Sequence, residues 1–516
     1  MTNLKLKLPN RKWQKWSEPL DRVAITIMLV LSGIIALLLW QGDHSSPRVR
    51  DFSWQDKQIG AVDNRFILTF SRPMDRESVE KNLQIIPPLP GKISWAGRRM
   101  AYTLIGPAPY GTEYELKLQG ATDRFNQPEN FSSSKDGLIQ PFSGKFRTRD
   151  RAFAYIGTEA DQIGRLMMIN LNQKEPKPIA LTPPDLVVNE FIPYGDARRI
   201  LFTANERASQ RQGTLDQKLY TVTTGINPLS PGVEASKPEP TGKIRLVLDS
   251  KDYQNLQFDL SANGQTIAVQ RVSRRNPGEF GIWIVKREND DRFNAHPLKG
   301  QPGGDFLITP DSKTLAITQG EGLAIVPLEI SQDQPLDFLP KFGTVSSFSK
   351  DGTAAAMVKF NTDYTRSLYL VTNQGTEKEL LRITGSIIDA QFDPMGQTIY
   401  CLLTKLLPGE QYQEQPYIAA VNLKTSEVKP LLVLPNHRNV RMSLSPDGIA
   451  LLFDQPVTTP VPAGGQSDSP RTESQEAVSS STLWLLPLVT STSEEMPTEM
   501  QPEQLPIPGF HPRWLP

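Results

Sequence analysis

The stretch "FDPMGQTIYCL", Phe392–Leu402, consists of an aromatic residue, a polar turn with a glycine, and an apolar strand. Glycine suits a tight turn because it tolerates positive φ, and Asp or Asn can hydrogen-bond its own backbone there. Five other stretches follow the same plan, usually with a glycine: "FIPYGDARRILF" from Phe191, "FDLSANGQTIAV" from Phe258, "FLITPDSKTLAI" from Phe306, "FSKDGTAAAMV" from Phe348 and "LSPDGIALLF" from Leu444. The unit is a repeat.

The spacing of the copies indicates the architecture. Successive copies begin 42 to 67 residues apart. A four-stranded propeller blade needs roughly 40 to 50 residues, and it is stable only when neighbouring blades stack around an axis. We therefore expect an all-β region, a β-propeller over residues 151–516.

The two ends of this region are expected to complete each other. "FHPRW", from Phe510, begins like another copy of the repeat, whereas Ala152–Asn172 and Lys177–Thr182 supply strands with no repeat strand before them. Pairing the two ends would form one composite blade and close the ring without exposed sheet edges. This predicts seven blades. Six is the alternative, because the 67-residue interval between the copies that begin at Phe191 and Phe258 leaves the count open.

Three insertions interrupt the repeats, near residues 224–243, 458–481 and 490–504. They are rich in Pro, Ser, Thr and Glu and poor in apolar residues, which predicts disordered loops. The alternative is a tether that becomes ordered on a partner.

Residues 63–150 show a second β-rich pattern. We expect strands in Asp63–Asp75, Tyr110–Gly120 and Ser143–Asp150, and a hairpin around "AGRR" in Gly91–Leu104. Short strands with turns every 8 to 12 residues or so are typical of an Ig-like β-sandwich.

The N-terminal region predicts a membrane anchor. Val23–Trp40 carries no charge, and its 18 residues would span roughly 27 Å as a helix. Basic residues dominate residues 1–22, which favours a cytoplasmic tail there. After a connector at 41–62, the bulk of the chain is expected in the periplasm or outside the cell, attached to the plasma (inner) membrane by one transmembrane helix. A cleaved signal peptide is the competing interpretation.

Charge and cysteine content exclude some classes of function. Lys plus Arg and Asp plus Glu both number 56, so no net charge attracts nucleic acid. The single cysteine, Cys401, permits no intrachain disulfide and is expected to be a buried structural thiol. None of the four histidines has the i, i+4 partner of a helical metal site, so His44, His296, His437 and His511 are assigned surface or packing roles.

The chain contains no catalytic motif that we recognise. It lacks a G-x-S-x-G nucleophile elbow, a P-loop and a dinucleotide fingerprint, so we expect no cofactor and no metal. Weak binding candidates are Arg271, Arg274 and Arg275 in "QRVSRRNPGEF", a loop that could meet an anionic polymer or headgroup. The alternative for these arginines is a solvated hairpin tip.

Two stretches of the chain each resemble a known family. "FSRPMD" from Phe70, "GKISWAG" from Gly91, "YGTEYEL" from Tyr110 and "FRT" from Phe146 resemble SbsA-type bacterial Ig-like domains, which implies a spacer or adhesive module of the cell envelope. "LSPDGIALLF" and "FDPMGQTIY" are similar to TolB-type propellers, which implies a protein-binding role. Neither resemblance transfers a binding residue.

Two functions follow as hypotheses. The first is a non-catalytic, membrane-anchored envelope protein whose Ig-like spacer presents the propeller to a protein or glycan. The second is an envelope hydrolase or lyase whose active site is assembled in the propeller channel from several blades. A channel with buried carboxylates beside an Arg or His would favour the second hypothesis.

Overall fold

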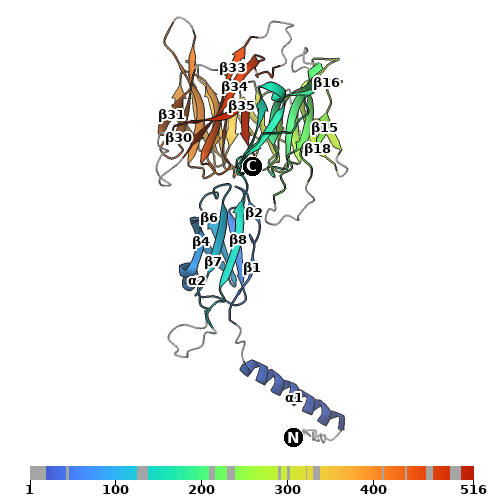
Figure 1. Ribbon diagram of the computed structural model, residues 1–516, viewed down its shortest axis with the longest axis vertical. Helices are drawn as coiled ribbons and strands as arrows, with labels where there is room; N and C mark the ends of the chain where they lie inside the picture. Colours follow the sequence, from blue (N-terminus) through green and yellow to red (C-terminus); the bar gives the residue numbers. More distant parts are fainter. Residues whose placement is uncertain are drawn as a thin grey trace, which may run out of the picture.

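The structure is a computed structural model that describes residues 19–41, 46–124, 137–208, 216–228, 239–288, 292–298, 303–320, 322–328, 337–409, 412–435, 439–460, 469–472, 474–488 and 501–516. Most of the predicted cytoplasmic tail and the central parts of the three predicted disordered insertions lie outside these ranges. A β-sandwich and a β-propeller are stacked end to end (Figure 1).

Helix α1 (Pro19–Gln41) forms where the sequence predicts a membrane-spanning helix. Within the described residues, however, no helix is both long enough and apolar enough to cross a bilayer. The prediction that Val23–Trp40 crosses a membrane is therefore not supported.

The sandwich consists of two four-stranded sheets. In spatial order, the first sheet contains β1 (Val49–Phe52), β3 (Arg65–Phe70), β6 (Arg99–Leu104) and β5 (Gly91–Ala96). The second contains β2 (Gln58–Ile59), β8 (Phe142–Thr148), β7 (Glu113–Leu118) and β4 (Leu83–Ile86). Strands β3 and β7 bury every second residue, so that Phe66, Leu68 and Leu116 meet in one core.

The sandwich begins earlier than the sequence predicts. Strands β1 and β2 lie in the expected connector at 41–62, where they are too short to show an alternating pattern. A helix, α2 (Arg76–Asn82), was also not predicted; its N-cap is Asp75, whose carboxylate accepts a hydrogen bond from Ser78 N. The predicted hairpin is confirmed, because β5 and β6 pair across a turn in which Gly97 has φ 60°.

Five four-stranded antiparallel sheets follow, each built from four consecutive strands. Blade 1 is β12 (Leu186–Pro193), β13 (Arg199–Glu206), β14 (Lys218–Thr223) and β15 (Ile244–Leu248); blade 2 is β16 (Tyr253–Leu260), β17 (Thr266–Ser273), β18 (Phe280–Arg287) and β19 (Phe293–Pro297). Blade 3 is β20 (Phe306–Ile308), β21 (Thr314–Gln319), β22 (Gly322–Pro327) and β23 (Asp337–Leu339); blade 4 is β24 (Thr344–Phe348), β25 (Ala354–Phe360), β26 (Arg366–Thr372) and β27 (Glu377–Ile383). Blade 5 is β28 (Ile387–Phe392), β29 (Thr398–Leu406), β30 (Glu414–Asn422) and β31 (Val428–Val433).

A seven-stranded sheet closes the ring. Its order is β11 (Ile179–Ala180), β10 (Leu166–Asn170), β9 (Ala152–Gly157), β35 (Glu503–Trp514), β34 (Ala477–Pro487), β33 (Ala450–Thr459) and β32 (Met442–Leu444), and a 3₁₀ turn, η2 (Ala160–Gln162), follows β9. The first half of β35 pairs with β34, as in Leu485↔Glu503, and the second half pairs with β9, as in Phe510↔Ile156.

Strand β35 therefore belongs to two blades. It is the last strand of blade 6 (β32–β35) and the first strand of blade 7 (β35, β9, β10 and β11). Counted over the described residues, the propeller has seven blades, as the sequence predicts, and the predicted pairing of its two ends is confirmed. The six-blade alternative is wrong.

Apolar clusters between adjacent blades hold the ring together. Leu315 of blade 3 packs with Ile282 of blade 2, and Cys401 of blade 5 is fully buried with Val358 of blade 4. Burial raises the pKa of the Cys401 thiol, so it stays protonated as the predicted structural thiol.

The predicted disordered insertions are partly strand. Thr458 and Thr459 end β33 and pair with Val478 and Ala477 at the start of β34, directly after a shift of register. Pairing to a neighbouring strand orders these residues despite their polar composition, because it satisfies their backbone hydrogen bonds.

The sandwich docks on the face of the propeller that carries the turns between the first and second strands of the blades. Arg149 Nη1 donates to Gly195 O of blade 1 at 3.1 Å and to Pro516 O at 2.8 Å. Lys350 of blade 4 donates to Ala61 O. Because blades 1 and 4 lie on opposite sides of the ring, the sandwich lies across this opening of the channel.

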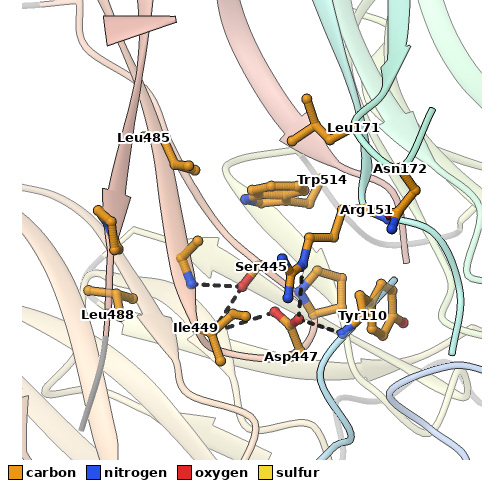
Figure 2. Close-up of a pocket in the computed structure, with 13 residues that line it drawn as sticks. Tyr110, Arg151, Leu171, Asn172, Ser445, Asp447, Ile449, Leu485, Leu488 and Trp514 are labelled. Carbon is orange, nitrogen blue, oxygen red and sulfur yellow. Dashed lines mark hydrogen bonds and ion pairs between the residues drawn. The ribbon is translucent and has the colours of Figure 1, made fainter. Parts of the chain in front are cut away.

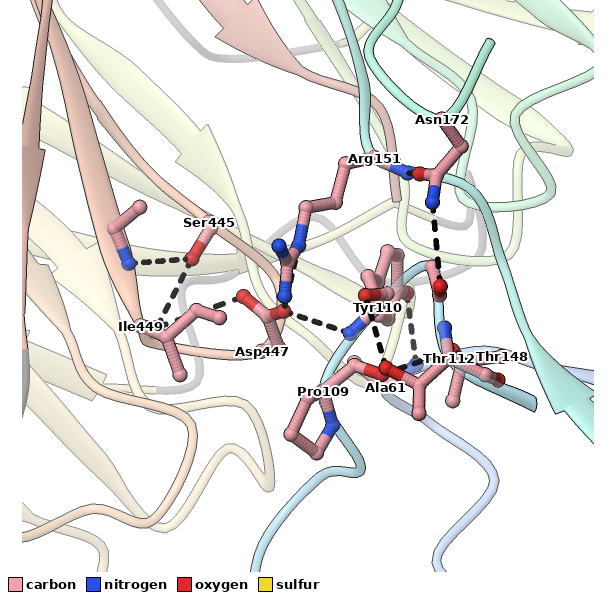
Figure 3. Close-up of polar contacts among 12 residues, drawn as sticks. Ala61, Pro109, Tyr110, Thr112, Thr148, Arg151, Asn172, Ser445, Asp447 and Ile449 are labelled. Atoms are coloured by element: carbon pink, nitrogen blue, oxygen red, sulfur yellow. Dashed lines mark hydrogen bonds and ion pairs between the residues drawn. The ribbon is translucent and has the colours of Figure 1, made fainter. Parts of the chain in front are cut away.

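A second part of the same interface involves blades 6 and 7 (Figure 3). Tyr110 N of the sandwich donates to Asp447 Oδ2 of blade 6 at 2.8 Å, and Asn172 Nδ2 of blade 7 donates to Gly111 O at 3.2 Å. The sandwich is thus attached to turns around most of the ring.

Candidate functional site

The first strands of neighbouring blades, from β16 to β35, contact one another around the axis of the propeller, where the sequence predicts a channel. Four blades contribute charged or titratable side chains from their first, inner strands: Glu190 (β12), Asp259 (β16), Asp389 (β28), and His511 and Arg513 (β35). A further basic residue, Arg441, lies directly before β32 of blade 6. These groups interact electrostatically: Arg513 acts on Glu190, Asp259 and Asp389. The channel therefore brings acidic and basic groups together, as the enzyme hypothesis requires.

Glu190, His511 and Arg513 form the central contact of this cluster. Glu190 Oε1 accepts from Arg513 Nη2 at 3.0 Å and lies 3.1 Å from His511 Nε2. The His511 side chain is almost fully buried and packs its ring on Phe191, with a centroid distance of 5.2 Å. The Glu190 side chain keeps 28% exposure.

The protonation states of this cluster follow from burial and charge. Burial opposes the ionised form of Glu190, but the charges of His511 and Arg513 hold the pKa of this carboxyl well below its usual range. Burial lowers the pKa of His511 despite the nearby carboxylate. Arg513 donates to both partners, through Nη2 to Glu190 Oε1 and through Nε to His511 Nε2 at 3.3 Å. A carboxyl with so low a pKa is a weak general base.

Two other acids have pKa values in the range that suits acid–base chemistry. Burial raises the pKa of Asp259 to about 6 and that of Asp454, a fully buried residue of β33, to about 7. Both oxygens of each carboxyl already accept backbone N–H groups: Asp259 from Leu260 and Ile308, and Asp454 from Arg441 and His511.

These bonds belong to a set of clamps between the blades. Among the described residues, each of the seven interfaces between adjacent blades has at least one side-chain hydrogen bond. With the donor first, the pairs are Gln217 with Asn255 O, Ile308 N with Asp259, Thr318 with Gly343 O, Ser347 with Ala390 O, Leu444 N with Gln391, His511 N with Asp454, and Arg513 with Glu190. Most of them join a side chain to the backbone of the next blade. Polar groups buried between sheets need such partners. The channel acids therefore have a structural role that accounts for their positions.

The predicted arginine cluster is not assembled as a patch. Arg271 is buried, and its guanidinium lies 4.7 Å from the centre of the Tyr253 ring and 5.0 Å from that of Trp283. Arg274 is paired with Asp216 at 2.5 Å. Arg275, with 88% of its side chain exposed, contacts Asp252 at 3.3 Å. Of the three, Arg275 alone has most of its surface in solvent.

The described histidines do not form a metal site. In the described part of the chain, no group of three or more His, Cys, Asp or Glu side chains could hold a metal ion. His296 is on β19, where burial lowers its pKa. His511 has the predicted packing role, but the prediction missed its contact with Glu190, because these residues lie far apart in the sequence. His44 and His437 lie outside the described residues.

A separate cavity of about 480 Å³ lies where the sandwich meets blades 6 and 7 (Figure 2). Its walls include Leu171, Leu485, Leu488 and Trp514, and its polar side is formed by Tyr110, Arg151 and Asp447. These residues come from three parts of the chain, so sequence reasoning did not find the cavity.

The chain was compared with known proteins. No protein-family model matches it, and no curated protein matches it. Solved structures do match: TolB from Acinetobacter baumannii, at 13% identity and TM-score 0.37, over 69% of this chain and 80% of that one. The periplasmic gluconolactonase PpgL from Pseudomonas aeruginosa matches at 12% identity and TM-score 0.41, over 71% of this chain and 99% of that one. An oligogalacturonate lyase from Vibrio parahaemolyticus matches at 10% identity and TM-score 0.41, over 59% and 87%. At this level of similarity the matches do not assign a function.

Proposed function

We propose that this chain is a non-catalytic binding protein in which the sandwich, an Ig-like spacer, presents the propeller to a protein partner. The observation that carries the proposal is the position of the sandwich, which occupies one face of the propeller and leaves the opposite face, with the loops between second and third strands, for binding. Loops at one end of a rigid scaffold commonly carry recognition.

Exposed aromatic side chains on that opposite face support the proposal. Tyr364, between β25 and β26, is 90% exposed, and Tyr412, between β29 and β30, is 62% exposed. Phe360, at the end of β25, is 58% exposed. Aromatic residues are enriched at the energetic centres of protein interfaces. Tyr412 also interacts with Arg366 of blade 4, so the loops of blades 4 and 5 form one surface.

Site-specific photo-crosslinking in cells tests this proposal on the full chain. A benzophenone amino acid is placed at Tyr364, at Tyr412, or at Val433 on the outer strand of blade 5, which is 60% exposed and serves as the control. The expected result is one discrete protein adduct from positions 364 and 412 that is absent from position 433. Adducts with glycan, equal labelling from all three positions, or none at all would contradict the proposal.

The second candidate function is a hydrolase or lyase that acts in the channel. The contact among Glu190, His511 and Arg513 favours it, because these groups converge from blades 1 and 7 and the Glu190 side chain is 28% exposed. The full chain and its Glu190→Gln variant are assayed against peptidoglycan fragments and acidic oligosaccharides. Turnover that Glu190→Gln abolishes, with the thermal melting temperature little changed, would favour the enzyme over the binding protein.

The cellular location is a prediction from the sequence. The basic residues before Val23 favour a cytoplasmic N-terminus, with the sandwich and propeller in the periplasm or outside the cell. Protease added to intact and to osmotically shocked cells tests it: the chain should be cut without lysis of the plasma membrane.

A further inference from the structure

The cavity between the sandwich and blades 6 and 7 combines an apolar wall with two side chains of opposite charge. Leu485 and Leu488 lie on one side, and Arg151 and Asp447 lie on the other (Figure 2). The indole of Trp514 adds an aromatic surface, and its buried Nε1 has no hydrogen-bond partner among the described residues. A volume of about 480 Å³ is in the range of small-molecule sites.

The Arg151 guanidinium is the unusual feature of this cavity. Its Nε forms an ion pair with Asp447 Oδ2 at 3.9 Å, too far for a hydrogen bond, and this buried Nε has no hydrogen-bond partner in the described part of the chain. The same Asp447 oxygen accepts from Tyr110 N at 2.8 Å. Nearby Arg149 donates through Nη1 to the backbone oxygens of Gly195 and Pro516, whereas no side-chain hydrogen bond of Arg151 is found in the described part of the chain.

The backbone of Arg151 is fixed while its side chain remains available. Its backbone N–H donates to Asn172 Oδ1 at 2.6 Å (Figure 3), and 40% of its side chain is exposed. A guanidinium with uncommitted donors suits a carboxylate, which it can bind through two parallel hydrogen bonds. The buried Asp447 carboxylate beside it disfavours a second negative charge on the ligand.

We propose that this cavity binds an amphipathic monocarboxylate, with the carboxylate on Arg151 and the apolar body against Trp514, Leu485 and Leu488. The site goes beyond the proposed partner-binding function and lies on a different face of the propeller. Because Tyr110 belongs to the sandwich and the apolar wall to the propeller, an occupant would contact both domains. Binding is expected to stabilise the folded chain by mass action.

Isothermal titration calorimetry of the full chain with decanoate, below its micelle-forming concentration, tests the proposal, with 1-decanol as the uncharged probe. We expect saturable binding of one decanoate per chain and binding of decanol at least tenfold weaker. Arg151→Gln should weaken decanoate binding by tenfold or so and leave decanol binding little changed. The matched control Arg275→Gln, on an exposed loop, should bind decanoate like the parent chain.

A second variant tests the apolar side of the cavity independently of Arg151. Leu488→Trp fills the apolar side of the cavity and keeps Arg151, so it should weaken both probes. Far-ultraviolet circular dichroism confirms that each variant is folded. Non-saturable binding, equal affinity for the two probes, or an unchanged affinity in either folded variant would overturn the proposal. The photo-crosslinking result does not depend on this cavity, so the two proposals fail separately.

Discussion

The ring of Trp514 meets the ring of Phe153 edge-on at a centroid distance of 5.6 Å, and the backbones of the two residues pair between β35 and β9. This contact joins the two ends of the propeller and buries Trp514 to 7% exposure. It is the point at which the closure of the ring can be tested most directly.

Trp514→Ala should destabilise the propeller by about 3–5 kcal/mol, because it leaves a cavity at the closure and removes the aromatic contact. Thermal and urea unfolding followed by circular dichroism measure the loss. Tyr364→Ala, at an exposed aromatic residue, is the control and should change stability by less than about 0.5 kcal/mol. Equal effects of the two substitutions would show that β35 does not close the ring.

The pH dependence of Asp454→Asn tests the clamp between blades 6 and 7. The pKa of Asp454 is raised to about 7 by burial, so the native state holds a proton that the unfolded chain releases above about pH 4. This group therefore adds stability at pH 5 that is lost as pH rises through 7. The variant cannot take up this proton, so its destabilisation relative to the parent chain should be larger at pH 5 than at pH 8.

Urea unfolding at the two pH values measures the difference for Asp454→Asn. The control Asp252→Asn changes an exposed side chain and should alter the free energy of unfolding by less than about 0.5 kcal/mol. A penalty for Asp454→Asn that is equal at both pH values, or greater at pH 8, would contradict the assignment.

Arg149→Met should weaken the attachment of the sandwich to the propeller. Arg149 Nη1 donates to Gly195 O and Pro516 O, and its loss leaves these carbonyl groups without this donor, at a cost of about 1–3 kcal/mol. Small-angle X-ray scattering should show a broader distribution of distances between the two domains. Arg147→Met, two residues away and about half exposed, is the control and should leave the distribution unchanged.

Arg271→Met separates a structural role from a binding role for the predicted arginine cluster. The substitution removes the cation–π contacts with Tyr253 and Trp283 and the hydrogen bond to Asn255, and should cost about 1–3 kcal/mol. Arg275→Met should be nearly neutral for stability because that side chain is exposed. Similar unfolding free energies for both variants would contradict the structural role of Arg271.

The sequence predicts the parts of the fold that have local patterns. Each "SPDG"-like turn with its following strand is visible in about a dozen residues, so the second strands of six blades and the turns before them were found, as was the hairpin around Gly97. Strands β1 and β2 were missed because two to four residues cannot show a period.

The candidate sites could not be predicted in the same way. Glu190 and Arg513 meet only because the ring closes, and nothing near either residue in the sequence indicates the other. Asp447 was identified only as a turn residue, although it also accepts the Tyr110 N–H that attaches the sandwich. A residue with a satisfactory local role gives no signal of a second, long-range role.

The sharing of β35 between two blades has a consequence for biosynthesis. Strands β9 and β34 both remain unpaired on one side until β35 is translated, and β9 emerges from the ribosome long before then. A nascent chain in this interval exposes two strand edges that can pair with other chains. Premature termination or proteolysis just ahead of Glu503 would leave both edges open at once, so the pairing of β35 decides whether the propeller closes or aggregates.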